Sequence, residues 1–291
     1  MSVRNYEINT VEDFENLNSE IEKRIKDSSP SGTENWRTFY RGEAKKYNDV
    51  NASIFRDDFL FNHEGKYLNF LRGNDEVSLN ALGKIQHYGG CTRLLDFSKD
   101  LNVALYMACC AHDCEDGYIY CYNTNFIDNE SDPICDIIKD YTFYNGSDLS
   151  GFLSKLADNY GKTVSDIVEI LKKDYFLDFD VLKDGNLRIQ RQSGLFLWMG
   201  DTNLKSSNAN KEKAMSLSDE DGRGSTYPGV VVIVKIAHEL KEKIRDRLEN
   251  PKIYTKGDLF PDEPKNNMTS YQNTERHFFE SFLKDKNKTK S

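Results

Sequence analysis

The residues best suited to chemistry gather in one stretch, QHYGGCTRLLDFSKDLNVALYMACC, which begins at Gln86. Gln86 and His87 form a polar pair, and Tyr88 and two glycines follow, which allow a tight turn. A short β-like run then ends at Asp96. Histidine titrates near neutral pH and can act as a general acid or base. We therefore place Gln86, His87, Tyr88 and Asp96 around one polar pocket, with a hydrogen-bonded turn histidine as the alternative for His87.

A helix is expected directly after this strand, with Asp96 or Ser98 as its N-cap. Its apolar residues recur at helical spacing, at Leu101, Ala104, Leu105 and Ala108. The first turn of a helix offers free N–H groups and partial positive charge to an anionic ligand. Arg93 is either a phosphate ligand or a strand-end partner of Asp96. An ordinary strand-to-helix turn with a capping aspartate is the alternative for the whole stretch.

A second candidate lies at the end of an aromatic, β-like run over residues 36–40, which is followed by Arg41 and Gly42. A guanidinium that leaves a rigid strand beside a glycine suits bidentate recognition of phosphate or carboxylate. Gly42 would then permit the close approach of the ligand. The alternative for Arg41 is a structural salt bridge to an acidic partner such as Asp96.

Length and composition narrow the function classes. The 291 residues can bury a sizeable core, and the formal net charge of −9 argues against nonspecific nucleic-acid binding. No apolar run approaches the ~20 residues that span a bilayer, so no membrane segment is expected. The N-terminal residues lack the apolar stretch of a signal peptide, which predicts a cytoplasmic protein. All six cysteines lie within residues 91–135 without finger-like spacing, so we expect buried thiols and no metal site.

The periodicity of apolar residues outlines the elements. Helices are expected at residues 8–27, 52–56, 67–82, 163–173, 238–248 and 274–283, and strands at 36–40, 92–95, 117–122, 187–198 and 229–235. Gln190 and Gln192 alternate in the strand at 187–198 and would share one sheet face. A polar loop is expected at 201–226.

These elements predict an α+β fold, with a single domain built on a central mixed sheet flanked by helices. We divide the chain into an N-terminal helical segment at 1–34, a main domain at 35–264, and a C-terminal helix with a disordered basic tail at 265–291. The acidic stretch at 124–184 holds too few apolar residues for a core of its own and is interpreted as an insertion in the main domain.

Several short motifs occur together in a fixed order: FYRGE from Phe39, SIFR from Ser53, QHYG from Gln86, TRLLDF from Thr92, ALY from Ala104, QSGLF from Gln192 and LFPD from Leu259. This set resembles the FRG domain, a prokaryotic and phage-associated family named for its (Phe/Tyr)-Arg-Gly motif. The resemblance covers residues from about 36 to 264.

The chain also resembles, more weakly, the ADP-ribosyltransferase fold, which implies a split sheet. In that fold an aromatic-Arg-Gly strand holds the nicotinamide dinucleotide, and a later strand carries Glu or Gln near the reaction centre. Arg41 and either Gln190 or Gln192 stand in the analogous order here. The second strand departs from the usual Ser-Thr-Ser, and the late glutamate is missing.

The resemblances imply a nucleotide-pocket effector that transfers ADP-ribose from NAD to an unknown acceptor, in phage defence or as a toxin. NAD would be its substrate, with no covalently bound cofactor. His87, Asp96 and Gln192 would be catalytic, and the set that binds the dinucleotide would be Arg41, Gly42, Gln86, Tyr88 and Arg93. The alternative is a non-catalytic sensor or interaction module in which Arg41, Arg93 and Asp96 form a buried ion network.

Overall fold

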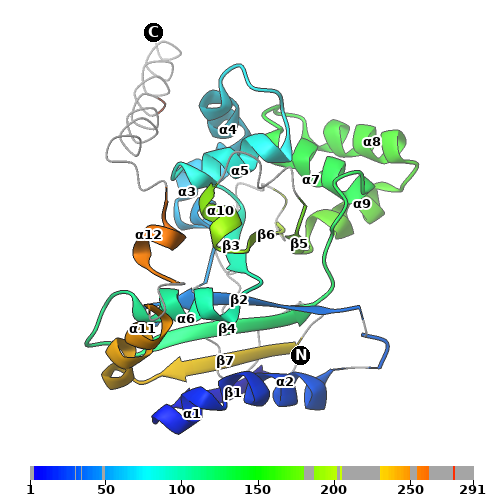
Figure 1. The fold of residues 1–291 in the computed structure, drawn as a ribbon. Coiled ribbons are helices and arrows are strands. Elements are labelled where there is room, and N and C mark those ends of the chain that lie inside the picture. The colour runs from blue at the N-terminus through cyan, green and yellow to red at the C-terminus, as the bar shows by residue number, and fades with distance from the viewer. Residues whose placement is uncertain are drawn as a thin grey trace.

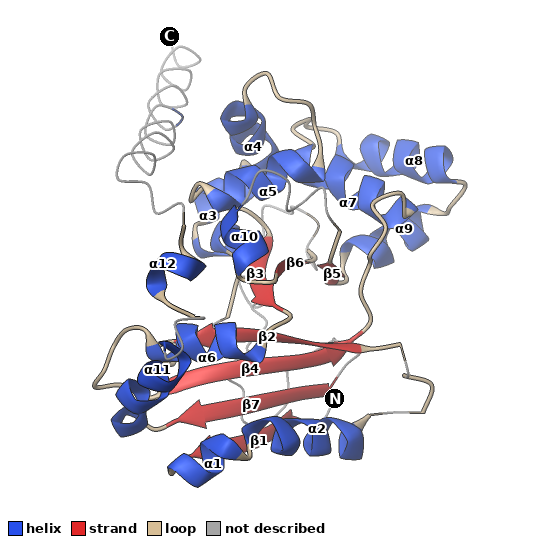
Figure 2. Ribbon diagram, in the orientation of Figure 1, coloured by secondary structure: helices blue, strands red, loops and turns tan. Residues whose placement is uncertain are grey.

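The computed structural model describes residues 3–29, 31–33, 35–47, 50–179, 187–201, 204, 230–249, 254–261 and 278. Within them the chain forms one mixed seven-stranded sheet in the order β1-β7-β4-β2-β3-β6-β5, flanked by helices (Figures 1 and 2). The α+β class with a central mixed sheet is therefore confirmed. The strands are β1 (Val3–Ile8), β2 (Arg37–Glu43), β3 (Leu94–Ser98), β4 (Gly117–Thr124), β5 (Tyr175–Leu177), β6 (Gly194–Trp198) and β7 (Val230–Ile236).

The sheet is narrowest between β2 and β3, which are joined at the single residue pair Tyr40 and Ser98. On one side of this junction, β1 pairs with β7 in parallel, and β7, β4 and β2 pair antiparallel. On the other side, β3, β6 and β5 form an antiparallel group. Figure 1 shows the two groups at different heights, with β2, β4 and β7 below and β3, β5 and β6 above.

Helices cover both groups of strands. They are α1 (Val11–Glu15), α2 (Leu17–Ser28), η1 (Ser53–Arg56), α3 (Asp58–Asn62), α4 (Glu64–Arg72), α5 (Leu79–His87), α6 (Leu101–Cys109), α7 (Pro133–Phe143), α8 (Leu149–Tyr160), α9 (Val164–Leu171), α10 (Leu187–Arg191), η3 (His238–Leu240), α11 (Lys241–Glu249) and α12 (Lys256–Leu259). Helices α2, α6 and α11 share one hydrophobic cluster with β4 and β7. Helices α3 to α5 and α7 to α9 share another with β3 and β6.

The acidic stretch at 124–184 holds helices α7 to α9 and the edge strand β5. Most of its buried side chains, among them Ile138, Leu156 and Ile167, belong to the same cluster as those of α4 and α5. The segment therefore shares the core of the main domain. Its helices have too few apolar residues for a separate core and must bury their apolar faces against neighbouring helices.

Three expectations about local structure need correction. Two of the expected helices are each divided in the structure: the one at 8–27 is two helices that meet at Asn16, and the one at 67–82 is α4, which ends at Arg72, and α5, which begins at Leu79. A strand that was not predicted, β1, precedes α1. The N-cap of α6 is Asp100, whose side chain accepts from the Asn102 N–H, and not Asp96 or Ser98. The strand β3 runs two residues further than its apolar pattern indicates, so the cap moves with it.

The third correction concerns the strand expected at 187–198. Its first part is the helix α10, and only Gly194–Trp198 is strand. Arginine and glutamine have good helix propensity, and a short alternation of polar and apolar residues does not outweigh it. Ser193, with φ of 46°, turns the chain between the two elements. Gln190 and Gln192 therefore do not share a sheet face.

The predicted basic tail, and nearly all of the loop at 201–226 and the helix at 274–283, lie outside the described residues. None of the helices in the described ranges combines the length and apolar character that a membrane crossing requires.

Candidate functional site

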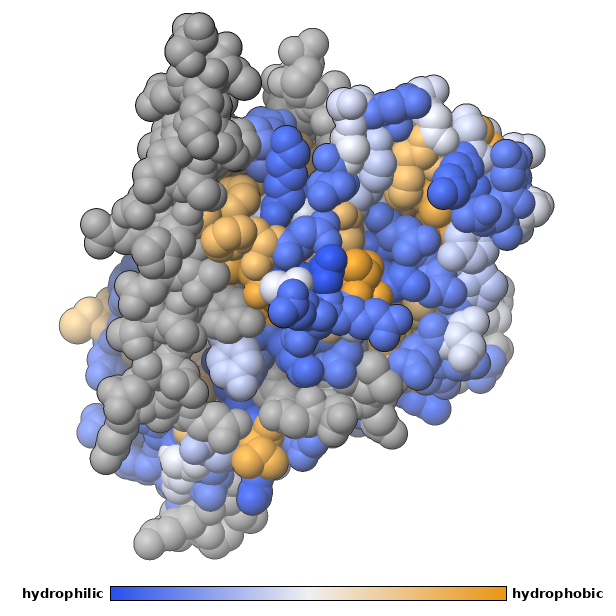
Figure 3. All heavy atoms as spheres, turned by 90° about the horizontal axis from the view of Figure 1, so that it is seen from above, coloured by the Kyte–Doolittle hydropathy of each residue, from blue (hydrophilic) through white to orange (hydrophobic). Residues whose placement is uncertain are grey.

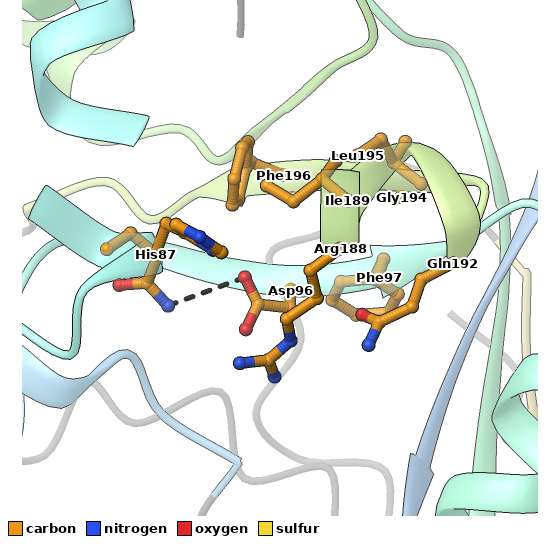
Figure 4. A pocket seen from close by; sticks show the side chains of 10 residues that line it. His87, Asp96, Phe97, Arg188, Ile189, Gln192, Gly194, Leu195 and Phe196 are labelled. Carbon is orange, nitrogen blue, oxygen red and sulfur yellow. Dashed lines mark hydrogen bonds between the residues drawn. The ribbon is translucent and has the colours of Figure 1, made fainter. Parts of the chain in front are cut away.

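A small pocket lies where α5, β3, α10 and β6 meet (Figure 4). Its volume is ≈ 20 Å³, which is room for about one water molecule. All three residues predicted to be catalytic line it, together with one of the predicted dinucleotide ligands. The lining residues are Gln86, His87, Asp96, Phe97, Arg188, Ile189, Gln192, Gly194, Leu195 and Phe196.

Asp96 supplies the pocket's carboxylate from the middle of β3, and it is exposed. The side-chain N–H of Gln86 lies 3.5 Å from Asp96 Oδ1, as the dashed line in Figure 4 marks. The side-chain carbonyl oxygen of Gln86 accepts a hydrogen bond from the Thr92 hydroxyl at 2.6 Å. Because this bond orients the amide, its N–H points toward the carboxylate. The turn between α5 and β3 thus positions a donor beside Asp96.

His87 is the last residue of α5 and lines the same pocket. Its ring meets that of Tyr88 edge to face, with 4.8 Å between the ring centroids. Tyr88 is 37% exposed and is not among the lining residues. Figure 4 shows the His87 ring and the Asp96 carboxylate on the same side of the cavity. Tyr88 therefore supports the histidine rather than forming a wall of the pocket.

Arg188 lies in α10 and Gln192 in the turn after it. Arg188 also contacts Phe260, the C-cap of α12, and Gln192 contacts Leu259 in α12. The Gln192 side-chain N–H donates to the Leu259 carbonyl at 2.9 Å. The Arg188 guanidinium lies over the Phe260 ring, 4.9 Å from its centroid. The Ser98 hydroxyl donates to the Gln192 main-chain carbonyl at 2.7 Å and fixes the turn to the end of β3. Arg188 was missed because a strand interpretation gave it no partner in the pocket.

Arg41 approaches Asp96 from the neighbouring strand. Its Nη1 donates to the Asp96 main-chain carbonyl at 2.9 Å, and its Nε donates to Glu43 Oε1 at 3.0 Å. The structural salt bridge considered as the alternative for Arg41 is therefore present, but its acidic partner is Glu43 and not Asp96. Arg41 is adjacent to the strand that carries Asp96, although it is not among the residues that line the pocket.

The neighbour of Gly42 is a helix rather than a ligand. A Cβ at this position would overlap the main-chain carbonyl of Ala104 in α6. The glycine therefore lets α6 pack directly on β2. The expectation that Gly42 admits a dinucleotide is corrected accordingly.

Arg93 is not a ligand of the pocket either. Its side chain is fully buried, and Nε and Nη2 bind the two carboxylate oxygens of Glu64 at 2.6 and 2.7 Å. Nη2 also lies 3.2 Å from the Asp201 carboxylate, to which the Tyr141 hydroxyl donates at 2.7 Å. Burial alone would lower the pKa of Arg93, but the adjacent carboxylates outweigh it and raise that pKa.

The expected buried ion network of Arg41, Arg93 and Asp96 is therefore wrong in its members. The buried network consists of Arg93, Glu64 and Asp201. Burial, and then the charge of Asp201, raise the pKa of Tyr141 well above its ordinary value, so this phenol stays protonated. The partners are 29 and 108 residues away from Arg93 in the chain, and no local pattern in the sequence indicates them.

Within the described residues, no group of three or more His, Cys, Asp or Glu side chains is placed to hold a metal ion. All six cysteines are free thiols. Burial raises the pKa of Cys109 and Cys135 to about 12, so these two thiols are poor nucleophiles at neutral pH.

Fold and site together define an α+β protein with an open mixed sheet and a small polar pocket beside its narrow junction. The model of the FRG domain family matches residues 36–117, under a third of the chain. This match supports the FRG resemblance for the part that contains Arg41, Gln86, His87 and Asp96, whereas the motif that begins with Gln192 lies beyond it. No curated protein and no solved structure matches the chain.

Proposed function

We propose that this chain is a nucleotide-binding effector that transfers ADP-ribose from NAD to an acceptor still to be identified. One observation carries the proposal. Side chains from three separate segments, His87, Asp96 and Gln192, converge on one pocket, with the guanidinium of Arg188 at its edge and that of Arg41 on the adjoining strand. A carboxylate beside cations is what cleavage of a glycosidic bond next to a pyrophosphate needs.

Each group has a role in this chemistry. Asp96 stabilises the positive charge that develops on the ribose as the bond to nicotinamide breaks. Gln86, which already donates toward Asp96, keeps that carboxylate oriented. His87 accepts a proton from the acceptor nucleophile. Arg41 and Arg188 bind the pyrophosphate, and Phe97 offers an aromatic wall to the nicotinamide.

Access to the pocket involves α10, because a volume of ≈ 20 Å³ holds about one water molecule and not a nucleotide. Two side-chain contacts connect this short helix and its turn to the α12 region: Gln192 with the Leu259 carbonyl and Arg188 with the Phe260 ring. We propose that NAD displaces Arg188 and Gln192 from these partners. Both side chains then bind the ligand instead, which offsets the free energy of leaving Leu259 and Phe260.

The test is release of nicotinamide from NAD by the purified chain, with total cell lysate as the source of acceptor. Asp96→Asn keeps the shape of the side chain and removes its charge, so release should fall on the order of 100-fold. Glu169→Gln removes an exposed carboxylate that pairs with Lys172 and does not line the pocket, and is the matched control. Equal rates for the Asp96 variant and native chain would refute the role of Asp96.

A non-catalytic sensing module is the second candidate, and the small pocket volume favours it. The two candidates differ in the same assay. A sensor binds NAD or ADP-ribose and releases no nicotinamide, whereas a transferase releases it. A chain that depletes NAD should also arrest the growth of cells that express it, as a toxin or phage-defence effector would, and Asp96→Asn should relieve the arrest.

A further inference from the structure

We infer that Phe278 is an aromatic anchor whose burial is coupled to the turn that follows Gln86 and His87. The anchor sits in a socket formed by Phe59 of α3 and by Tyr67 and Phe70 of α4. The inference does not depend on the proposed reaction, because the ring contacts of Phe278 and the bond from Cys91 to Tyr67 involve residues outside the pocket lining.

The socket holds Phe278 through three ring contacts. The centroid of the Phe278 ring lies 5.4 Å from that of Tyr67, 5.5 Å from that of Phe70 and 6.4 Å from that of Phe59. All three ring pairs are steeply inclined, with interplanar angles of 72°, 55° and 60°. These are favourable aromatic geometries.

Burial shows that this is an insertion and not a surface contact. Phe278 is 4% exposed and belongs to the hydrophobic cluster of the upper helices. Phe70, on the rim of the socket, is still 41% exposed. Figure 3, which looks onto these helices from above, shows hydrophobic atoms in separate patches on a largely hydrophilic face. An aromatic side chain with such partners gains more from the socket than from solvent.

Tyr67 links the socket to the turn. Its side chain is fully buried, its ring contacts Phe278, and its hydroxyl accepts from the Cys91 main-chain N–H at 2.9 Å. Cys91 follows the turn that begins at His87, and the next residue, Thr92, bonds the Gln86 side chain. One rigid side chain therefore touches both the anchor and the backbone that positions the pocket.

The coupling follows from the stiffness of a phenol. The hydroxyl lies at the far end of the rigid ring, so a swing of the Tyr67 ring about its Cα–Cβ bond moves the oxygen relative to the Cys91 N–H. Removal of Phe278 leaves a void beside the ring and takes away the contact that fixes its tilt. The bond to Cys91 should then open more often, and the turn with it.

Amide hydrogen exchange of the full-length chain tests the anchor. Phe278→Ala should speed exchange of the Cys91 amide about tenfold, while the amides of β4 keep their native rates. Tyr47→Ala removes an aromatic side chain that is 43% exposed and is not part of the socket. It is the control, with Cys91 exchange expected within about twofold of native. Should Phe278→Ala fail to fold, Phe278→Leu fills most of the socket and should give a smaller acceleration at the same amide.

Tyr67→Phe keeps the ring and removes the hydroxyl. It therefore distinguishes an effect carried through the Tyr67–Cys91 hydrogen bond from a general loss of stability. It should speed Cys91 exchange by itself, and adding Phe278→Ala should then have little further effect at this amide. Unchanged Cys91 exchange in Phe278→Ala would overturn the inference. So would a full additional effect of Phe278→Ala in the Tyr67→Phe background, or an equal acceleration in β4.

Discussion

At the scale of single residues, Asp96 connects the pocket to the neighbouring strand, because its side chain faces the pocket and its main chain bonds Arg41 of β2. Its carboxylate lies in the pocket beside Gln86, and its main-chain carbonyl accepts from Arg41. Arg41 in turn pairs with Glu43, which is 5% exposed and whose second oxygen has no hydrogen-bond partner in the described part of the chain. Arg41 can therefore serve the fold, the ligand or both.

A double substitution separates these roles of Arg41. Arg41→Met leaves the Glu43 carboxylate buried without its counter-charge, so the free energy of unfolding should fall by about 2 kcal/mol. Adding Glu43→Gln removes the uncompensated charge and should restore most of that loss. Affinity for ADP-ribose, measured by titration calorimetry, should stay low in both variants, because neither has the guanidinium.

Recovery of affinity together with stability in the double variant would show that Arg41 acts only on the fold. If the free energy of unfolding of Arg41→Met equals that of the native chain, the ion pair with Glu43 contributes little to stability.

Residues close together in the sequence were the predictable part of the site. Gln86 and His87 end a helix and Asp96 lies on the strand that follows, so local pattern was enough to group them around a pocket, and all three line it. Gln192 was chosen as a strand residue, yet it reaches the pocket from the turn after α10. Arg93 was misassigned because its partners, Glu64 and Asp201, are distant in the sequence and the surrounding charge pattern does not reveal them.

At the scale of elements, the contact between β2 and α6 sets the frame of the site. Gly42 has no side chain, which lets the Ala104 carbonyl of α6 lie directly on the strand. Helix α6 follows β3, which carries Asp96, and β2 carries Arg41, so this contact helps to place the two strands relative to one another. The (Phe/Tyr)-Arg-Gly motif thus combines a polar residue beside the site with a glycine that the packing requires.

Gly42→Ala should lower the free energy of unfolding by about 1–3 kcal/mol, because its methyl group must displace helix backbone. Gly257→Ala is the control, since a Cβ there would meet only the Thr255 hydroxyl at 3.8 Å and alanine favours a helix. Urea unfolding measures both. A native-like midpoint for Gly42→Ala would mean that α6 moves away from β2 at little cost.

Elements were predictable where apolar periodicity was long, as in β4, β7 and α11, and failed where it was short or depended on a distant partner. The strand β1 precedes the first helix and is completed by parallel pairing with β7, more than 220 residues later. Nothing local distinguishes it from a polar N-terminal segment. The helix α10 was missed because five residues are too few for periodicity to decide between helix and strand.

At the scale of the whole molecule, the Arg93 network joins the upper helices to the sheet. The arginine stands just before β3, while Glu64 comes from α4, Tyr141 from α7 and Asp201 from the segment after β6. Four aromatic rings, of Phe55, Phe61, Tyr141 and Trp198, surround the guanidinium at 5.2 to 5.8 Å from their centroids. The network therefore acts on the assembly of the layers and not on the pocket.

Arg93→Met should lower the free energy of unfolding by ~3–5 kcal/mol, because two buried carboxylates lose their shared cation. Arg247→Ala breaks an exposed pair with Glu15 and is the control; its cost should be about 0–1 kcal/mol. Thermal unfolding followed by circular dichroism compares the two. Similar costs for both variants would contradict the structural role of Arg93.

The central claim is that a nucleotide enters the pocket lined by His87, Asp96 and Gln192, and the histidine side chains report on it most directly. The chain has five histidines, and His87→Asn identifies the signal of His87 in a proton–nitrogen spectrum of the imidazoles. Titration with NAD should shift the His87 signal and leave those of His112 and His238 in place, because neither lines the pocket. If NAD binds while the His87 signal stays fixed, the nucleotide lies elsewhere and the proposed site is wrong.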